Sequence, residues 1–223
     1  MKRKIITTDD GSSSLYVPEL DETYHSTFGA VNEALHVFIK KGLAERKHLN
    51  PLRILEVGFG TGLNALLTLQ KSMDHGINVH YTGLEKHPIT TEELAEINHG
   101  KQLNLQSEFK QLHDCPWEVE NEINANFSLK KLQFDLIEDE LMGQFDLVYF
   151  DAFAPNKQSE MWSKEVFEKI FKQMNNKALL VTYCCQGQVK RTLKSVGFTI
   201  AKTDGPPGKR EMLTATKSIH LPS

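Results

Sequence analysis

A glycine-rich turn preceded by an acid is the most distinctive chemical feature of this sequence. Gly58, Gly60 and Gly62 follow a short apolar run, and Glu56 lies just before them. Glycine has no Cβ, so a turn built from it lets the backbone approach a nucleotide-like ligand closely. The spacing departs from the G-x-G-x-x-G of dinucleotide-binding turns, because Leu63 or Ala65 would have to serve as the third glycine. An acid before the turn suits S-adenosylmethionine, whose methionine part carries a positive amino group, so we expect this cofactor.

Two acids further along the chain could bind the rest of the same cofactor. Glu85 ends the next apolar run, where a carboxylate can accept hydrogen bonds from both hydroxyls of a ribose. The alternative for Glu85 is an ordinary surface glutamate at a strand end. Asp135 is expected to accept a hydrogen bond from the adenine amino group, although Asp139 and other nearby acids compete for that role.

Asp151, Phe153 and Pro155 belong to the segment Asp-Ala-Phe-Ala-Pro, which follows a strongly apolar run. Amine methyltransferases often carry an acid or amide, a proline and an aromatic residue at this place beside the methyl donor. An alkylamine has a pKa of about 10 and an ordinary aspartate one of about 4, so Asp151 is poorly matched to act as a strong base. We expect Asp151 to bind and orient an amine, with the proton lost to water or through the carboxylate. Phe153 and Trp162 could wall the acceptor pocket, and ordinary packing explains either aromatic residue equally well.

Basic residues gather near the C-terminus, although the whole chain has a formal net charge of -3. Lys209 and Arg210 follow a Pro-Pro-Gly turn, and Lys190 and Arg191 precede it along the chain. A local patch of this kind can attract phosphate groups even on a mildly acidic protein. Lys209 and Arg210 are therefore candidates for contacts with nucleic acid, and the alternative is an ordinary solvated surface.

Short apolar runs alternate with helical stretches from residue 52 onward, and this alternation predicts the elements that position these side chains. We expect strands at residues 52–57, 79–84, 132–137, 145–150, 178–184, 198–202 and 212–217. We expect helices at residues 62–71, 90–96, 163–174 and 188–196. Such alternation is typical of a mostly parallel sheet with helices on both faces. The expected fold class is therefore α/β, with a Rossmann-like sheet of seven strands, one of them antiparallel because a turn alone joins the last two.

Residues 1–50 do not follow this alternation. Residues 7–16 look extended, and residues 30–43 look helical, with one buried stripe. We expect residues 1–50 to form an N-terminal extension packed on a main domain of residues 51–223.

Composition and absent motifs exclude several classes of protein. No apolar run approaches the roughly 18 residues that cross a bilayer, and polar residues follow the basic N-terminus where a signal peptide needs an apolar core. A cytoplasmic protein without membrane contact is therefore expected. Three cysteines without a Cys-x-x-Cys pair argue against a disulfide framework and a metal site. The sequence also lacks a Walker A lysine motif, a His-Glu-x-x-His motif and a nucleophile elbow, which argues against kinases, metalloproteases and hydrolases.

Residues 56–64, Glu-Val-Gly-Phe-Gly-Thr-Gly-Leu-Asn, resemble a motif of the MnmC-type tRNA methyltransferases. Segments 21–26, 84–88, 151–155 with Met161-Trp162, and 208–212 also resemble this family, in the family's order. The resemblance covers essentially the whole chain. It implies N-methylation, by S-adenosylmethionine, of the 5-aminomethyl group of 5-aminomethyl-2-thiouridine at the tRNA wobble position. It also implies functional coupling to the enzymes that install the aminomethyl group.

The resemblance implies further site residues. Those implied at the cofactor are Phe59, Asn64 and Lys86, and those implied at the substrate are Phe153, Pro155, Trp162, Lys209 and Arg210.

The sequence departs from the family pattern in one loop and in length. Ala152 stands where the family usually has glycine, and residues 156–159 form a looser version of its loop, which should alter loop geometry and leave the chemistry intact. Larger members carry a flavin-dependent oxidase domain, for which this sequence has no room, so a stand-alone methyltransferase is expected. Two alternatives remain open. One is a methyltransferase for small-molecule or protein amines, and the other is a dinucleotide oxidoreductase or a non-catalytic nucleotide-binding module.

Overall fold

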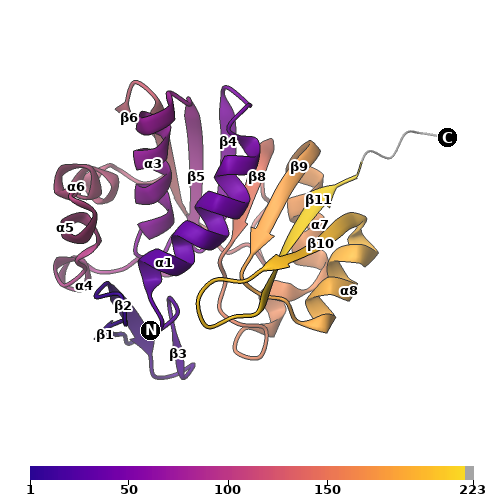
Figure 1. Cartoon of the computed structure of the whole chain (residues 1–223), viewed down its shortest axis with the longest axis horizontal. Coiled ribbons are helices and arrows are strands. Elements are labelled where there is room, and N and C mark those ends of the chain that lie inside the picture. Colours follow the sequence, from indigo (N-terminus) through magenta and orange to yellow (C-terminus); the bar gives the residue numbers. More distant parts are fainter. Residues whose placement is uncertain (219–223) are drawn as a thin grey trace.

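One sheet runs through the middle of the molecule, with helices on both of its faces (Figure 1). The computed structural model describes residues 1–218. The strands of this sheet are β4 (Leu52–Val57), β5 (Val79–Glu85), β6 (Glu120–Asn124), β7 (Phe127–Gln133), β8 (Phe145–Phe150), β9 (Met174–Thr182), β10 (Phe198–Asp204) and β11 (Glu211–Lys217). Their order across the sheet is β10-β11-β9-β8-β4-β5-β7-β6. Neighbours from β9 to β7 pair in parallel, whereas β11 and β6 pair antiparallel to their neighbours.

The predicted α/β class and the mostly parallel sheet are confirmed. The predicted number of strands in this sheet is too low, because the sheet has eight strands within the described residues and β6 is the additional one. The predicted strand at 132–137 is displaced, since β7 ends at Gln133. Beyond it the Asp135 side chain accepts from the backbone N–H of Ile137, and the Asp139 side chain accepts from that of Asp135. These local bonds compete with strand pairing and turn the chain into a loop.

Helices cover both faces of the sheet, and so two apolar cores form. The helices are α1 (Ala30–Ala34), the π-helical η1 (Leu35–Leu43), α2 (Ala44–Arg46), α3 (Leu63–His75), α4 (Thr91–Ala95), α5 (His99–Leu103), α6 (Gln106–Asp114), the 3₁₀ turn η2 (Ser159–Trp162), α7 (Lys164–Gln173) and α8 (Gly187–Val196). In β8, Tyr149 packs with the core that includes η1 and α3, while its neighbour Phe150 packs with the core that includes α7 and α8. Strands buried on both faces explain the continuous apolar runs of the sequence.

Local signals of the sequence mark several helix ends. Thr90 begins α4 with a capping box that Glu93 completes, and the Ser163 hydroxyl accepts from the backbone N–H of Val166 at the start of α7. Gly197, with φ 112°, ends α8 in the left-handed conformation that glycine favours. None of the helices within residues 1–218 is both long and apolar enough to span a bilayer.

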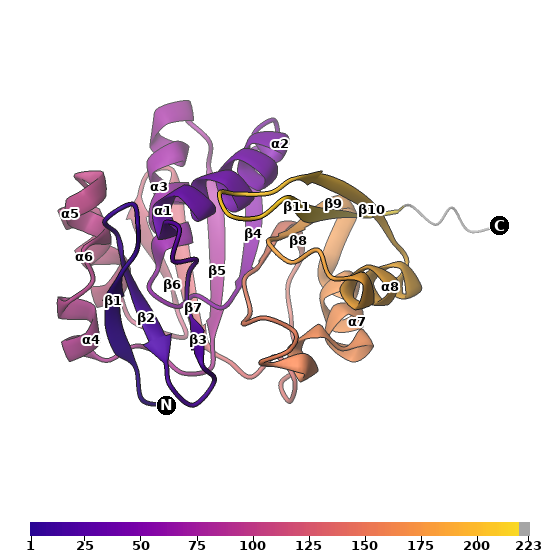
Figure 2. The same ribbon diagram turned by 60° about the horizontal axis from the view of Figure 1, so that its bottom comes forward.

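The first fifty residues form a small sheet and the helical segment that follows it. The strands of the sheet are β1 (Lys4–Thr7), β2 (Ser13–Val17) and β3 (Glu22–Thr23). This sheet lies beside α4, α5 and α6 (Figure 2), and the backbone N–H of Ser13 donates to Asn98 Oδ1 at 2.8 Å. The segment from α1 to α2 crosses one face of the sheet, where Gly42 lies against Tyr149 and Val181. The N-terminal region thus contacts residues far away in the sequence, while residues 219–223 of the expected main domain lie outside the described part.

Candidate active site

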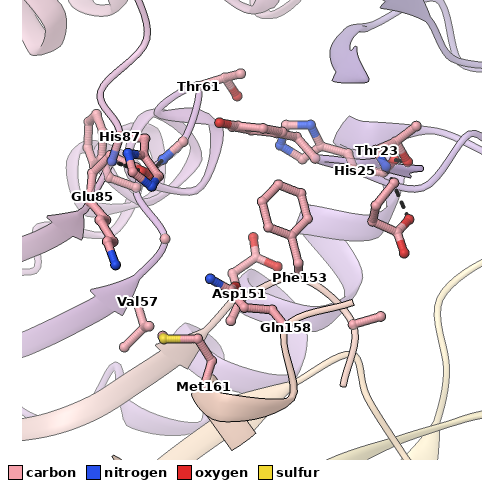
Figure 3. A pocket seen from close by; sticks show the side chains of 18 of the residues that line it. Thr23, His25, Val57, Thr61, Glu85, His87, Asp151, Phe153, Gln158 and Met161 are labelled. Atoms are coloured by element: carbon pink, nitrogen blue, oxygen red, sulfur yellow. Dashed lines mark hydrogen bonds between the residues drawn. The ribbon is translucent and has the colours of Figure 1, made fainter. Parts of the chain in front are cut away.

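A cavity of about 570 Å³ opens at the edge of the sheet where the parallel strands end. Its walls include residues that directly follow each of β4, β5, β7, β8 and β9, together with the N-terminal segment and the β10–β11 turn. Ligands bind at this edge in open α/β sheets, because the carboxyl ends of parallel strands converge there. Figure 3 shows Asp151 and Phe153 pointing into this space, with Glu85 on another part of the wall.

The glycine turn brings bare backbone to the cavity. Gly58 and Gly60 have φ values of 88° and 52°, which side chains other than glycine rarely tolerate. A Cβ at Gly58 would lie 2.7 Å from the carbonyl oxygen of Asp151, so β4 and β8 approach closely only because this position is glycine. Gly62, with φ 73°, begins α3. The turn therefore offers the close backbone approach that the sequence predicts for a nucleotide-like ligand.

Phe59 packs beneath the turn instead of facing the ligand space openly, and only 3% of its surface is exposed. A Cβ at Gly83 would lie 2.5 Å from the Phe59 ring, so the glycine in β5 makes room for this aromatic side chain. Phe59 is still one of the residues that line the cavity. Its main physical role here is to hold the turn against β5.

Two histidines, the buried His99 and the half-buried His113, fix Thr61 within the turn. The Thr61 hydroxyl and His99 Nε2 are 2.9 Å apart, and His113 Nε2 donates to the Thr61 carbonyl at 3.1 Å. Burial lowers the pKa of His113 to about 4, and that of His99 also lies well below its usual value. Both rings are therefore neutral near pH 7 and act as hydrogen-bonding supports for the turn. No local sequence pattern predicts this role, because the two histidines lie on α5 and α6, far from Thr61 along the chain.

Glu85 is the acid best placed to bind a diol. Its Oε2 accepts from the backbone N–H of Gly60 at 2.9 Å, and its Oε1 accepts from that of His87 at 2.8 Å. These bonds fix the carboxylate at the cavity wall, and each oxygen keeps a second lone pair for a ligand hydroxyl. The contact of Glu85 with both ribose hydroxyls stays a prediction.

Glu56 is not brought to the cavity, in contrast to its expected direct contact with the cofactor. It is fully buried, and its Oε1 accepts from Asn64 Nδ2 at 2.8 Å. Burial holds the pKa of Glu56 well above its usual range and so favours the neutral form. The same Asn64 nitrogen donates to Asp151 Oδ2 at 2.9 Å. Asn64, which lines the cavity, thus links the buried acid of β4 to the acid that follows β8.

Lys86 and Asp135 meet at the rim of the cavity. Lys86 Nζ and Asp135 Oδ2 are 2.6 Å apart, and the hydrogen bond from Lys86 lowers the pKa of Asp135. Both residues line the cavity. The structure thus brings the two predicted cofactor residues together, with the Asp135 carboxylate already partnered by a cation.

Asp151 is half-buried and has a fixed orientation, because Asn64 donates to its carboxylate. Burial raises the pKa of its carboxyl to about 7, and the negative charge of Glu33 adds to this increase. The hydrogen bond from Asn64 and the charge of Lys209 act in the opposite direction. In contrast to the ordinary aspartate expected from the sequence, this carboxyl has a pKa close to neutral pH and is well matched to accept and release protons.

The three predicted substrate residues around Asp151 have different positions. Phe153 lines the cavity and meets Tyr24 edge to face, with ring centroids 5.2 Å apart. Trp162 is buried outside the cavity wall, where its Nε1 donates to the Phe153 carbonyl oxygen at 2.8 Å. Pro155 also lies away from this wall, beside Trp162 in a shallow surface depression. Ordinary packing thus explains Trp162, which fixes the loop that carries Phe153.

The two basic residues after the Pro-Pro-Gly turn also separate. Lys209 lines the cavity, where its Nζ lies 2.6 Å from Glu33 Oε1 and 4.0 Å from the centre of the Tyr183 ring. Arg210 is exposed beside it. Lys209 is therefore placed as part of the cavity wall, unlike the exposed phosphate contact that the sequence suggests, whereas Arg210 remains available at the surface.

Several lining residues were missed by reasoning from the sequence. They are Tyr24, His25, Glu33, Met161 and Tyr183. Tyr24, His25 and Met161 belong to segments that carry the family resemblance, so a signal existed without an assigned role. Glu33 and Tyr183 had no such signal. Within residues 1–218, no group of three or more His, Cys, Asp or Glu side chains is placed to hold a metal ion.

Comparison with known proteins identifies the family. A family model described as S-adenosyl-L-methionine-dependent methyltransferase matches residues 92–218. The bifunctional protein MnmC of tRNA 5-methylaminomethyl-2-thiouridine biosynthesis from Burkholderia multivorans is 34% identical, over 92% of this chain and 33% of the relative. The corresponding protein from Cupriavidus necator is 33% identical, over 90% of this chain and 32% of the relative. The chain thus spans about a third of the length of these curated relatives.

Solved structures agree with this assignment. The structure of MnmC2 from Aquifex aeolicus aligns with a TM-score of 0.76 and 28% identity, over 100% of this chain and 72% of that chain. A methyltransferase from Pyrococcus furiosus, 18% identical, shares the fold with a TM-score of 0.51 over 91% of each chain. The dinucleotide oxidoreductase and non-catalytic alternatives are not favoured. The chain belongs to the family of S-adenosyl-L-methionine-dependent methyltransferases.

Proposed function

We propose that this enzyme methylates the amino group of 5-aminomethyl-2-thiouridine at the wobble position of tRNA. The observation that carries the proposal is the position of Asp151, a carboxyl with a pKa of about 7, on the wall of the cavity that the glycine turn also lines. The proposal is supported by the printed function of the MnmC relatives, which concerns 5-methylaminomethyl-2-thiouridine in tRNA. It also implies action in the cytoplasm and functional coupling to the enzymes that install the aminomethyl group.

The donor side of the cavity fits S-adenosylmethionine. Gly58 keeps its place at the turn free of any Cβ, and the Glu85 oxygens retain acceptor capacity for a ribose. Asp135 lies at the rim as the proposed partner of the adenine amino group. When bound, this cofactor supplies an electrophilic sulfonium methyl group. Enzymes accelerate such displacements largely by aligning the reacting atoms.

The acceptor side suits an amine attached to a flat ring. Phe153 and Tyr24 supply aromatic surface, on which a base taken out of a loop can stack. Asp151 lies next to Phe153 in this part of the cavity (Figure 3). A free alkylamine is largely protonated at pH 7, so it must lose a proton before its nitrogen can attack. A carboxyl with a pKa of about 7 can take that proton.

Methyl transfer from labelled S-adenosylmethionine to tRNA tests the proposal. The tRNA would come from cells that lack the enzyme, and the nucleosides would be analysed after digestion. We expect label in 5-methylaminomethyl-2-thiouridine only. The same tRNA lacking the aminomethyl group should accept no label and serves as the matched control. Label on another nucleoside, or on small amines or proteins instead of tRNA, would contradict the proposed substrate.

A further inference from the structure

Lys209 and Glu33 form an ion pair inside the cavity. The pair joins the N-terminal region to the last hairpin. Lys209 belongs to the β10–β11 turn and Glu33 to α1, 176 positions apart in the sequence. Their side chains are only 34% and 11% exposed. The second Glu33 oxygen accepts from the backbone N–H of Ser26 at 2.8 Å, and the Lys209 ammonium lies over the Tyr183 ring. Both charges are therefore fixed in position, unlike those of an exposed lysine and glutamate.

The pair acts on the same part of the cavity as Asp151. Glu33 raises the pKa of Asp151 and Lys209 lowers it, so both charges are felt at this carboxyl. Opposite and like charges retain strong effects in a partly desolvated cavity, where water screens them weakly. The other polar and titratable groups that interact with Asp151 are Asn64 on α3, Glu56 on β4, Tyr81 on β5 and Tyr183 after β9. Glu22, on β3, acts on Tyr183 in turn.

We propose that Lys209, held in place by Glu33, sets the pH at which the acceptor amine loses the proton that blocks methyl transfer. The inference rests on the proposed methylation of an amine. In this reaction the acceptor ammonium gives one N–H proton to the Asp151 carboxylate or to water. The freed nitrogen lone pair forms the N–C bond as the C–S bond breaks, and the electron pair of that bond stays on sulfur. The product leaves as a secondary ammonium ion, and any proton on Asp151 returns to water.

The direction in which each charge shifts the pH–rate profile does not depend on whether the amine or Asp151 keeps the remaining proton. At low pH both the amine and Asp151 are protonated, and this state cannot react. The first proton leaves the coupled pair at one macroscopic pKa, which defines the acidic side of the pH–rate profile. The positive charge of Lys209 lowers this pKa and the negative charge of Glu33 raises it. Lys209 therefore acts as a positioning residue that works through electrostatics, and its substitution must move the profile in a defined direction.

Single-turnover rates between about pH 5.5 and 9, with enzyme in excess over labelled tRNA, report this macroscopic pKa. We expect Lys209→Met to move the acidic limb of the profile to higher pH by about one unit, and Glu33→Gln to move it to lower pH by a similar amount. The double variant should return close to the wild-type profile, because it removes both charges. Lys202→Met is the matched control, since Lys202 pairs with Glu211 at 2.6 Å on the same hairpin with both side chains more exposed.

The conservative variant Lys209→Arg keeps the charge and should keep the limb near its wild-type position, even if the rate falls. Binding of S-adenosylmethionine to each variant shows that the fold is retained. An unchanged limb in both single variants, or shifts in the same direction, would overturn the inference. If Lys209→Met fails to fold, Glu33→Gln and Lys209→Arg decide the matter alone. A wild-type enzyme that methylates no tRNA would instead contradict the proposed function.

Discussion

Asp151 shows how a common residue acquires uncommon chemistry from its surroundings. One carboxylate oxygen is fixed by Asn64 at 2.9 Å, and burial raises the carboxyl pKa to about 7. We expect Asp151→Asn, which keeps the size and polarity of the side chain, to slow methyl transfer by about 10²- to 10⁴-fold, the usual contribution of a positioned acid–base group. Calorimetric binding of S-adenosylmethionine should stay within a few-fold of wild type, because the donor contacts lie elsewhere. Unaltered turnover would exclude the role given to Asp151.

The same substitution should change how stability depends on pH. The folded-state pKa of Asp151 is about 7 and its ordinary value is 3.8, so the folded protein holds this proton more tightly than the unfolded chain. The contribution of Asp151 to stability is therefore fully present below about pH 4 and is lost as the pH rises through 7. The unfolding midpoint of Asp151→Asn, relative to that of wild type, should therefore rise as the pH increases from 5 to 8. Thermal unfolding of both proteins across this range measures the difference between their midpoints. A difference that rises toward low pH instead would contradict the raised pKa of Asp151.

At the scale of elements, the turn between β4 and α3 and the end of β8 depend on each other. A Cβ at position 58 would lie 2.7 Å from the Asp151 carbonyl oxygen, and the φ of 88° adds strain for any residue but glycine. Gly58→Ala should therefore displace both the donor turn and the Asp151 segment, and weaken S-adenosylmethionine binding by at least tenfold. Gly76→Ala is the control, since Gly76 also has a positive φ of 64° but a Cβ there meets nothing within 4 Å. Equal binding of S-adenosylmethionine by the two variants would contradict the role given to the close approach of Gly58 to the Asp151 carbonyl oxygen.

The separation of interacting residues along the chain explains which features the sequence could predict. Apolar runs, capping residues and the glycine turn act locally, so they predict the parallel sheet, the edge at which the cavity opens and the places of Glu85 and Asp151 along it. The sequence predicts Lys209 at the surface, because its partner, Glu33, lies 176 positions away and no local pattern indicates such a pair. The sequence predicts Glu56 at the cofactor because of its place before the turn. Only the packing of α3, which brings Asn64 between Glu56 and Asp151, shows that the acid is buried.

Across the whole molecule, the cavity is closed by segments from both ends of the chain. Tyr24 and Glu33 come from the first fifty residues, and Lys209 comes from the last hairpin. The division into an extension of residues 1–50 and a main domain from residue 51 stays a prediction. The lining residues nonetheless make this N-terminal region part of the cavity wall. An acceptor carried by a large substrate must reach Asp151 past these segments, so nearby exposed charges become relevant to its binding.

Arg210 is the exposed cation next to the cavity residue Lys209, and it offers a test of how the proposed tRNA substrate is held. Each phosphate contact releases counterions, so the loss of one contact lowers affinity and reduces the slope of log affinity against log salt by about one. We expect this of Arg210→Ala, with S-adenosylmethionine affinity unchanged. The matched control is Arg53→Ala, because Arg53 is also exposed but lies near the start of β4, at the opposite edge of the sheet. Filter binding of tRNA over a series of salt concentrations measures both slopes. A salt slope equal to that of wild type in Arg210→Ala, or an equal loss in both variants, would show that tRNA does not approach the cavity from the Arg210 side.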